Sequence, residues 1–294
     1  MALTRYILKI VFFGLWLIPL NIFAQAGQNS LHAPDTIKNG SKDSSHSLFA
    51  GGGYGSNMIY LGSTMSQDQP YGYGNLTYGF KNKLFASFSA VHLSGYDPFL
   101  AFYIGALNYN QVINSWFDVS AGAYRYQVPS SLADTLFSSF TYGDLTLGFD
   151  WKLLYTKLSF GGLLSEENQA YFQFRNSRYF QTPEFFNRKA NVSFDPYANL
   201  LFGTLVEVET ISEPGVVVSS PGRKWKKYTS PGTNTSYSKK MGIIEIDFGI
   251  PVSLNTDFMT IEAEIDYVLP LHKDAIYAGT KGFVFMLSGY FRIF

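Results

Sequence analysis

The residues whose types and spacing could support catalysis are His92 and Ser94, an imidazole and a hydroxyl separated by Leu93. In an extended strand this spacing puts both side chains on one face, as a histidine base that activates a serine nucleophile requires. Asp97 is the nearest acid that could orient the imidazole. Because a His-x-Ser sequence is common by chance, we assign no catalytic residue and keep an enzyme based on His92 and Ser94 as an alternative.

Charged residues that alternate with apolar ones form a second group of candidates. Between 259 and 269, Thr, Glu and Asp occupy one phase, and Met, Ile, Ala, Tyr and Leu occupy the other. Residues 244–250 repeat the arrangement, with Ile and Phe on one phase and two acids on the other. Across the chain the polar phases carry Asp118, Asp144, Lys157, Arg175, Asp195, Glu207, Glu245, Asp247, Glu262, Glu264, Asp266 and Arg292.

A basic cluster forms the third candidate site. Arg223, Lys224, Trp225, Lys226 and Lys227 lie within the long polar stretch 210–240. Four cations around one tryptophan are suited to anionic lipid headgroups such as those of lipopolysaccharide. A solvated loop with a solubilising run of charge is the alternative interpretation.

Composition excludes several classes of site. The chain has no cysteine and four histidines, and no histidine pair has a metal-ligand interval, so we predict neither a metal site nor a cofactor. Formal net charge is zero, with 22 acidic and 22 basic residues, which does not favour nucleic-acid binding. The glycines of GGGYG at 51–55 precede no helix, so they fit a crowded strand better than a phosphate loop.

The first 45 residues are expected to lie outside the folded domain. Residues 1–24 have two early cations, an apolar run and a small-residue cleavage site after Ala24 or Ala26, which predicts an export signal. Residues 25–45 are rich in Ser, Asn, Lys and Asp, which predicts a flexible periplasmic segment. Residues 46–294 are then a single all-β domain.

The elements that must position these candidates are strands. Twelve segments of period two are separated by turn-rich breaks, near 47–61, 70–80, 83–93, 99–110, 115–128, 138–150, 153–163, 169–180, 190–209, 241–251, 257–269 and 282–294. Tight connections alternate with mostly longer ones, as in transmembrane barrels, where short turns face the periplasm. The fold class predicted is an antiparallel transmembrane β-barrel of about twelve strands with its charged phases inward.

Register estimates follow from folding each hairpin about its expected turn. They place Arg175 near Asp195 and Lys157 near Asp144. They also place Glu245 and Asp247 opposite Glu262 and Glu264. The apolar phases, including Phe102 and Ile104 in the fourth segment and Ile244 in the tenth, are expected to face lipid.

The chain resembles the outer-membrane β-barrel proteins of Gram-negative bacteria through its signal sequence, its loop alternation and its last segment, GFVFMLSGYFRIF. The resemblance implies an outer-membrane location with both termini periplasmic, contact with outer-membrane lipids and lipopolysaccharide, and recognition of the final strand by the barrel-assembly machinery. The His92–Ser94 spacing also resembles that of lipid A deacylase barrels. Phe294 departs from the pattern because it falls on the inward phase.

The function we predict is a passive barrel with a polar, charged lumen, either a narrow pore for a small polar solute or a plugged structural barrel. Twelve strands lie between barrels filled by side chains and barrels with an aqueous channel, so strand number does not separate these two. The alternatives are a lipid-modifying enzyme that uses His92 and Ser94 and a surface-interaction protein that acts through loop 210–240.

Overall fold

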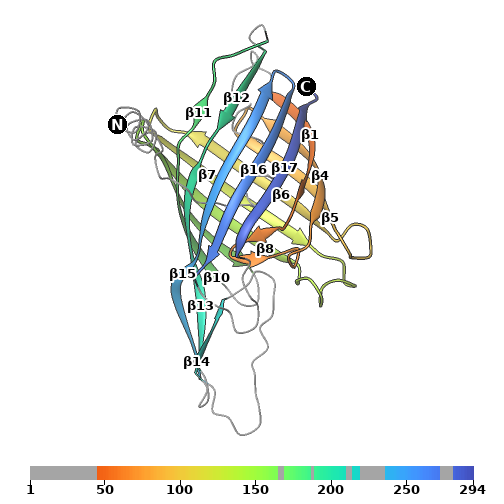
Figure 1. Ribbon diagram of the computed structural model, residues 1–294, viewed down its shortest axis with the longest axis vertical. Coiled ribbons are helices and arrows are strands. Elements are labelled where there is room, and N and C mark those ends of the chain that lie inside the picture. The colour runs from red at the N-terminus through yellow and green to blue at the C-terminus, as the bar shows by residue number, and fades with distance from the viewer. Residues whose placement is uncertain (1–44, 165–168, 187–188, 210–213, 219–235, 272–280) are drawn as a thin grey trace, which may run out of the picture.

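The computed structural model describes residues 45–164, 169–186, 189–209, 214–218, 236–271 and 281–294 (Figure 1). Among these residues no helix is long and apolar enough to cross a membrane. The predicted signal (1–24) and almost all of the predicted flexible segment (25–45) lie outside the described residues.

Twelve long strands form the body of the molecule. They are β1 (His46–Gly55), β4 (Tyr71–Phe80), β5 (Leu84–Leu93), β6 (Phe102–Val112), β7 (Phe117–Gln127), β8 (Phe140–Asp150), β9 (Tyr155–Leu164), β10 (Gln169–Ser177), β13 (Tyr197–Glu209), β15 (Ser236–Thr256), β16 (Met259–Pro270) and β17 (Gly282–Arg292). Each pairs antiparallel with its neighbours, β1 pairs with β17, and β13 pairs with β15, so the sheet closes on itself. The predicted antiparallel barrel of about twelve strands is confirmed.

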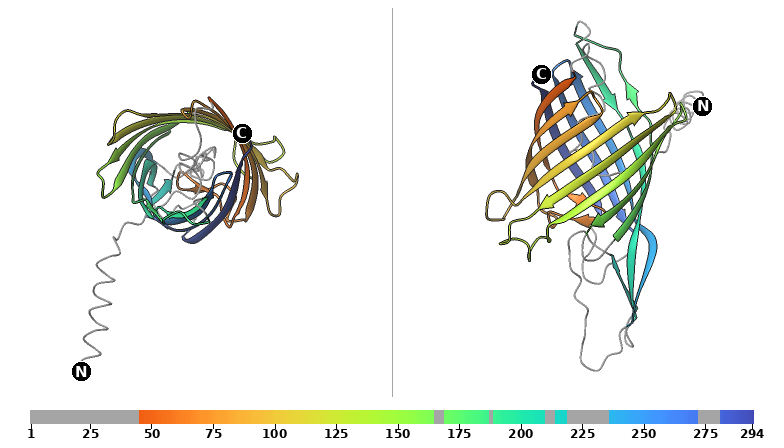
Figure 2. Two further views of the ribbon diagram at one scale, coloured as in Figure 1. Left: turned by 90° about the horizontal axis from the view of Figure 1, so that it is seen from above. Right: turned by 180° about the vertical axis from the view of Figure 1, so that it is seen from behind.

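Five short strands extend this wall or fold beside it. β11 (Phe180–Gln181) and β12 (Ala190–Phe194) form a hairpin whose second strand pairs with β15. β14 (Pro214–Val218) pairs with the far end of β13. β2 (Ile59–Tyr60) and β3 (Ser63–Thr64) pair only with each other. Figure 2 shows the two extensions at opposite ends of the barrel.

The two ends of the barrel differ in their connections. Only three or four residues separate β4 from β5, β6 from β7 and β8 from β9, and β15 joins β16 through Asp257 and Phe258. The first residues of β1 and the last of β17 lie at this same end, which we call the turn end. The opposite, loop end carries the connections from β1 to β4 and from β7 to β8.

Inward-facing tyrosines pack over inward-facing glycines on neighbouring strands. A Cβ at Gly55 would lie 2.3 Å from Cε1 of Tyr71, and a Cβ at Gly249 would lie 2.6 Å from Cζ of Tyr197. Both distances are shorter than any real contact, so each ring occupies the space that the glycine leaves. This explains the glycine-rich first strand as a crowded strand rather than a phosphate loop.

Candidate functional site

The connection from β1 to β4 crosses the barrel interior. Tyr60 packs against Tyr126 of β7 and Tyr142 of β8, with ring centroids 5.0 and 5.7 Å apart. A Cβ on Gly62 would lie 2.4 Å from Cγ2 of Ile244, which belongs to β15 on another part of the wall. We call residues 57–69 the plug. Figure 2, in the view along the barrel, shows this orange part of the chain inside the ring of strands.

Hydrogen bonds centred on Asn57 hold the plug in its folded shape. Its amide nitrogen donates to Asp68 Oδ1 at 2.7 Å. Its amide oxygen accepts from the hydroxyls of Thr64 and Ser66 at 2.8 and 2.7 Å. The backbone N–H of Met65 donates to the Met58 carbonyl at 2.6 Å, which closes the hairpin. The plug therefore has its own internal structure.

Two further connections pack against the plug at the loop end. The Gln67 amide nitrogen donates to the carbonyl of Thr135 in the connection from β7 to β8. The hydroxyl of Tyr96, in the connection from β5 to β6, donates to Gln67 Oε1 at 2.6 Å. Phe137, also in the connection from β7 to β8, packs edge-on against Phe102 of β6, with ring centroids 5.2 Å apart. Plug, connections and wall share one buried apolar cluster, which fills the interior near the loop end.

On the turn-end side of this cluster lies a buried charged group, formed by Arg175 on β10 and four acids on β15 and β16. The Arg175 guanidinium stacks on the Tyr197 ring, with Cζ 3.4 Å from the centroid. The Tyr197 hydroxyl donates to Glu264, and Arg175 attracts Glu264 and Asp266 electrostatically. Glu264 and Asp266 are each 1% exposed, so protein atoms surround them on all sides.

The other two acids of this group bind neutral donors. Asn199 Nδ2 donates to Asp247 Oδ2 at 2.8 Å, and the backbone N–H of Gly62 donates to Glu245. The second contact joins the plug directly to the charged group. Within the described residues, no group of three or more His, Asp and Glu side chains has the geometry of a metal site.

The remaining predicted charges are placed differently. Asp118 accepts a hydrogen bond from the Tyr155 hydroxyl at 2.7 Å, and Glu262 accepts one from Ser253 at 2.6 Å. The side chain of Glu207 lies outside the described residues. The remaining charged residues are all partly exposed, namely Asp118, Asp144, Lys157, Asp195, Glu262 and Arg292.

The register estimates were wrong. Arg175 is opposite Asn199 and Lys157, while Asp195 lies beyond the start of β13. Lys157 is opposite Gly148, and Asp144 is opposite Gly161. Glu262 and Glu264 face Ser253 and Pro251 rather than acids, because the hairpin turns at 257–258 instead of 253–256. A small error in the turn displaces every partner along both strands.

Three phase or boundary predictions were also wrong. Phe102 and Ile104 lie on the inward phase of β6 instead of facing outward, opposite the buried residues Val91 and Ser89 of β5, and Phe137 packs against Phe102. Ile244 is buried because the β13–β15 register shifts between Leu201 and Phe202, which lets two successive residues of β15 point inward. The first strand ends at Gly55 rather than 61, since Met58 to Leu61 belong to the plug.

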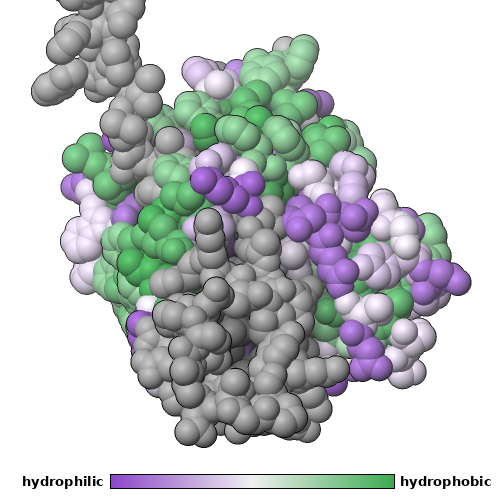
Figure 3. All heavy atoms as spheres, turned by 60° about the horizontal axis from the view of Figure 1, so that its bottom comes forward, coloured by the Kyte–Doolittle hydropathy of each residue, from purple (hydrophilic) through white to green (hydrophobic). Residues whose placement is uncertain are grey.

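The outward phase of the wall is apolar and exposed. Phe88, Leu107, Leu145, Phe160, Ile265 and Phe285 all show 45% or more of their surface. At the turn end Trp116 and Trp151 stack on either side of Phe149, as in the aromatic girdles of membrane barrels. Figure 3 shows hydrophobic residues covering much of the wall, with hydrophilic residues mainly near the loop end. The chain has the fold of an outer-membrane β-barrel.

No protein-family model and no curated protein sequence matches this chain. Solved structures of outer-membrane barrels do. The NanC porin is 10% identical, with a TM-score of 0.44 over 83% of this chain and 98% of that one. LpxR from Salmonella typhimurium is 8% identical, with a TM-score of 0.41 over 83% and 99%. A bacterial polysaccharide outer membrane secretin is 8% identical, with a TM-score of 0.41 over 85% and 98%. These likenesses concern architecture and assign no role to any residue.

The barrel places His92 on the outward phase near the loop end. Its ring stacks on Phe99 with centroids 4.3 Å apart, and Nδ1 lies 2.6 Å from the Phe99 carbonyl oxygen. Ser94 bonds through its backbone N–H to the Pro70 carbonyl. The imidazole thus contacts a backbone carbonyl. An enzymatic role for the pair stays a prediction.

The basic cluster Arg223, Lys224, Trp225, Lys226 and Lys227 lies outside the described residues.

Proposed function

We propose that this protein is a passive outer-membrane barrel that is closed by its own plug and does not conduct solutes in this state. The observation that carries the proposal is the course of residues 57–69 across the interior, with Tyr60 against one part of the wall and Gly62 against another. Barrels of intermediate size are open or closed according to what fills them.

The charged group supports a closed barrel rather than a narrow pore. In a water-filled channel the acids lining the lumen would be hydrated. Here Glu264, Asp266 and Asp247 are at most 2% exposed. Tyr197 donates to one oxygen of Glu264 and one of Asp266, and Asn199 donates to one oxygen of Asp247. Buried charges require such partners, so this group belongs to the packing of the barrel.

The test is conductance in planar bilayers. The wild-type barrel is expected to give no current steps, because the plug fills its loop half. A variant with residues 58–65 replaced by an equally long Gly-Ser linker is expected to give steps, since the linker lacks the apolar side chains that hold the plug inside. The control replaces residues 182–185, between β11 and β12 at the turn end, by a Gly-Ser linker of four residues and should stay silent. Regular steps from the wild-type protein would refute the proposal.

A further inference from the structure

One arginine lies on the lipid-facing side of the barrel wall. Arg125 belongs to the outward phase of β7, two residues from the loop end of that strand, and is exposed. The wall around it is apolar, with Leu107 and Leu145 at least 45% exposed on the neighbouring strands β6 and β8. A cation on this surface costs free energy that grows with depth in the bilayer, so it requires a counter-charge or contact with headgroups.

Arg125 has neutral partners within the protein. Its Nη1 donates to Thr141 Oγ1 and its Nη2 to Gln127 Oε1, both at 3.2 Å. Neither partner neutralises the charge. The guanidinium is held by two strands and still presents donors suited to a phosphate oxygen.

A hollow in the wall lies beside this arginine. Ala123, on β7 two residues from Arg125, pairs with Gly143 of β8, which makes Arg125 and Gly143 diagonal neighbours about 7–8 Å apart. Gly143 pairs with Gly162 of β9, and Gly162 with Ala170 of β10. Gly143, Gly162 and Ala170 form the floor of a shallow hollow of about 580 Å³.

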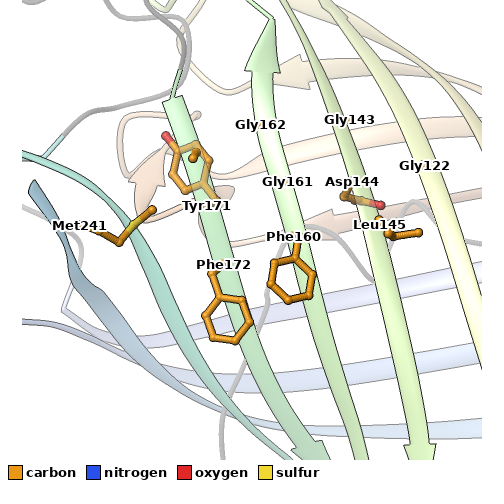
Figure 4. Close-up of a pocket in the computed structure, with 11 residues that line it drawn as sticks. Gly122, Gly143, Asp144, Leu145, Phe160, Gly161, Gly162, Tyr171, Phe172 and Met241 are labelled. Atoms are coloured by element: carbon orange, nitrogen blue, oxygen red, sulfur yellow. The ribbon is translucent and has the colours of Figure 1, made fainter.

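Large apolar side chains border this floor. Leu145, Phe160, Phe172 and Met241 line the hollow (Figure 4). The figure shows Phe160 and Phe172 on adjacent strands, next to the bare backbone of Gly161 and Gly162. Their side chains stand out from the sheet while the floor carries nothing larger than the methyl group of Ala170, so the bilayer must fill the space between them with hydrocarbon.

We propose that this part of the wall, Arg125 together with the hollow, is a binding site for a phosphate-bearing lipid of the leaflet at the loop end. Arg125 binds the phosphate, and an acyl chain lies over Gly143 and Gly162 against Leu145 and Phe160. The site depends on this wall facing lipid and does not depend on whether the plug closes the lumen.

The experiment titrates the folded full-length barrel, purified in a non-ionic detergent, with dioleoyl phosphatidylglycerol and counts bound lipids by native mass spectrometry. Parallel titrations use dioleoylglycerol, which lacks the phosphate, and inorganic phosphate, which lacks the chains. The proposal expects saturable binding of the phospholipid, with much weaker binding of either part. Equally tight binding of dioleoylglycerol, or displacement of the lipid by inorganic phosphate alone, would overturn it.

Variants separate this site from general coating of the wall by lipid. Arg125→Gln is expected to weaken phospholipid binding about tenfold, the scale of one charge-assisted hydrogen bond. Its control is Lys83→Gln, at the turn end, which should bind like the wild type. Equal affinity in Arg125→Gln and wild type would refute the phosphate contact.

The hollow is tested by filling it. Gly143→Leu adds a side chain over the floor, and the sheet accepts it because a Cβ there meets only the Gly122 carbonyl oxygen, at 3.6 Å. Gly105→Leu is the matched control, since a Cβ at this glycine of β6 has nothing within 4 Å. We expect weaker binding in the first variant alone. If Gly143→Leu loses the heat-modifiable migration of a folded barrel, Gly162→Ala takes its place. Unchanged affinity in a folded filling variant would refute the hollow as the acyl site.

Discussion

The hydroxyl groups of Tyr73 on β4 and Tyr290 on β17 lie 3.0 Å apart, although a whole strand separates their backbones. The intervening strand is β1, which pairs with both. The two side chains meet on the inner side of β1 because Gly51 and Gly53 of that strand have no side chains. A Cβ on Gly53 would lie 2.7 Å from Cε1 of Tyr73, and one on Gly51 would lie 2.5 Å from Cδ1 of Tyr290.

This contact predicts that Gly53→Ala destabilises the barrel. The new methyl group forces Tyr73 from its position and breaks its contact with Tyr290, at a cost of about 1–3 kcal/mol, as for other overpacked sites. Gly74→Ala on β4 is the control, because a Cβ there has nothing within 4 Å. Urea unfolding in detergent micelles, followed by tryptophan fluorescence, measures both. Equal midpoints for the two variants would contradict the packing account.

Removing the guanidinium from the buried charged group should also destabilise the barrel. Arg175→Met leaves Glu264 and Asp266 without their nearby cation, at a cost of about 3–5 kcal/mol in free energy of unfolding. The double variant Arg175→Met/Asp266→Asn removes a charge of each sign and should recover part of this loss. The same unfolding assay decides the point. A double variant less stable than Arg175→Met would show that the two charges do not offset each other.

The position of the plug predicts that Gly62→Val opens the barrel. Gly62 has φ of +80°, and its Cβ would strike Ile244, so valine combines backbone strain with a steric clash against the wall. The expected result is current steps in planar bilayers. Gly95→Val is matched in backbone strain, with φ of +83° at Gly95 and nothing within 4 Å of its Cβ, and should stay silent. Steps from both variants would implicate general loosening of the loops rather than the plug.

A barrel of this passive kind should leave lipids chemically intact. Purified protein incubated with lipid A and with phospholipids is expected to release no fatty acid, because His92 contacts the Phe99 carbonyl and is stacked on its ring. Mass spectrometry of the extracted lipids checks this. Fatty-acid release that disappears in both His92→Ala and Ser94→Ala would establish the enzyme instead.

The sequence by itself determined the class of fold. Period-two alternation in twelve segments, with alternating connection lengths, predicts a closed membrane barrel. In each strand the apolar phase indicates which face meets lipid, and this pattern can be recognised from neighbouring residues alone. Most strand positions follow from the same signal. Strands such as β16 were clear because their two phases differ strongly in polarity.

Only the tertiary structure decided what fills the barrel. Met58 to Leu61 read as a continuation of β1, since an apolar run does not reveal whether it lies in the wall or crosses the interior. Register is likewise non-local, because a turn displaced by a few residues moves Glu264 from Glu245 to Pro251. Phe102 faces inward because of the register between β5 and β6, and Ile244 because of a bulge in β15. Partners of these kinds come from distant parts of the chain, and no local pattern records them.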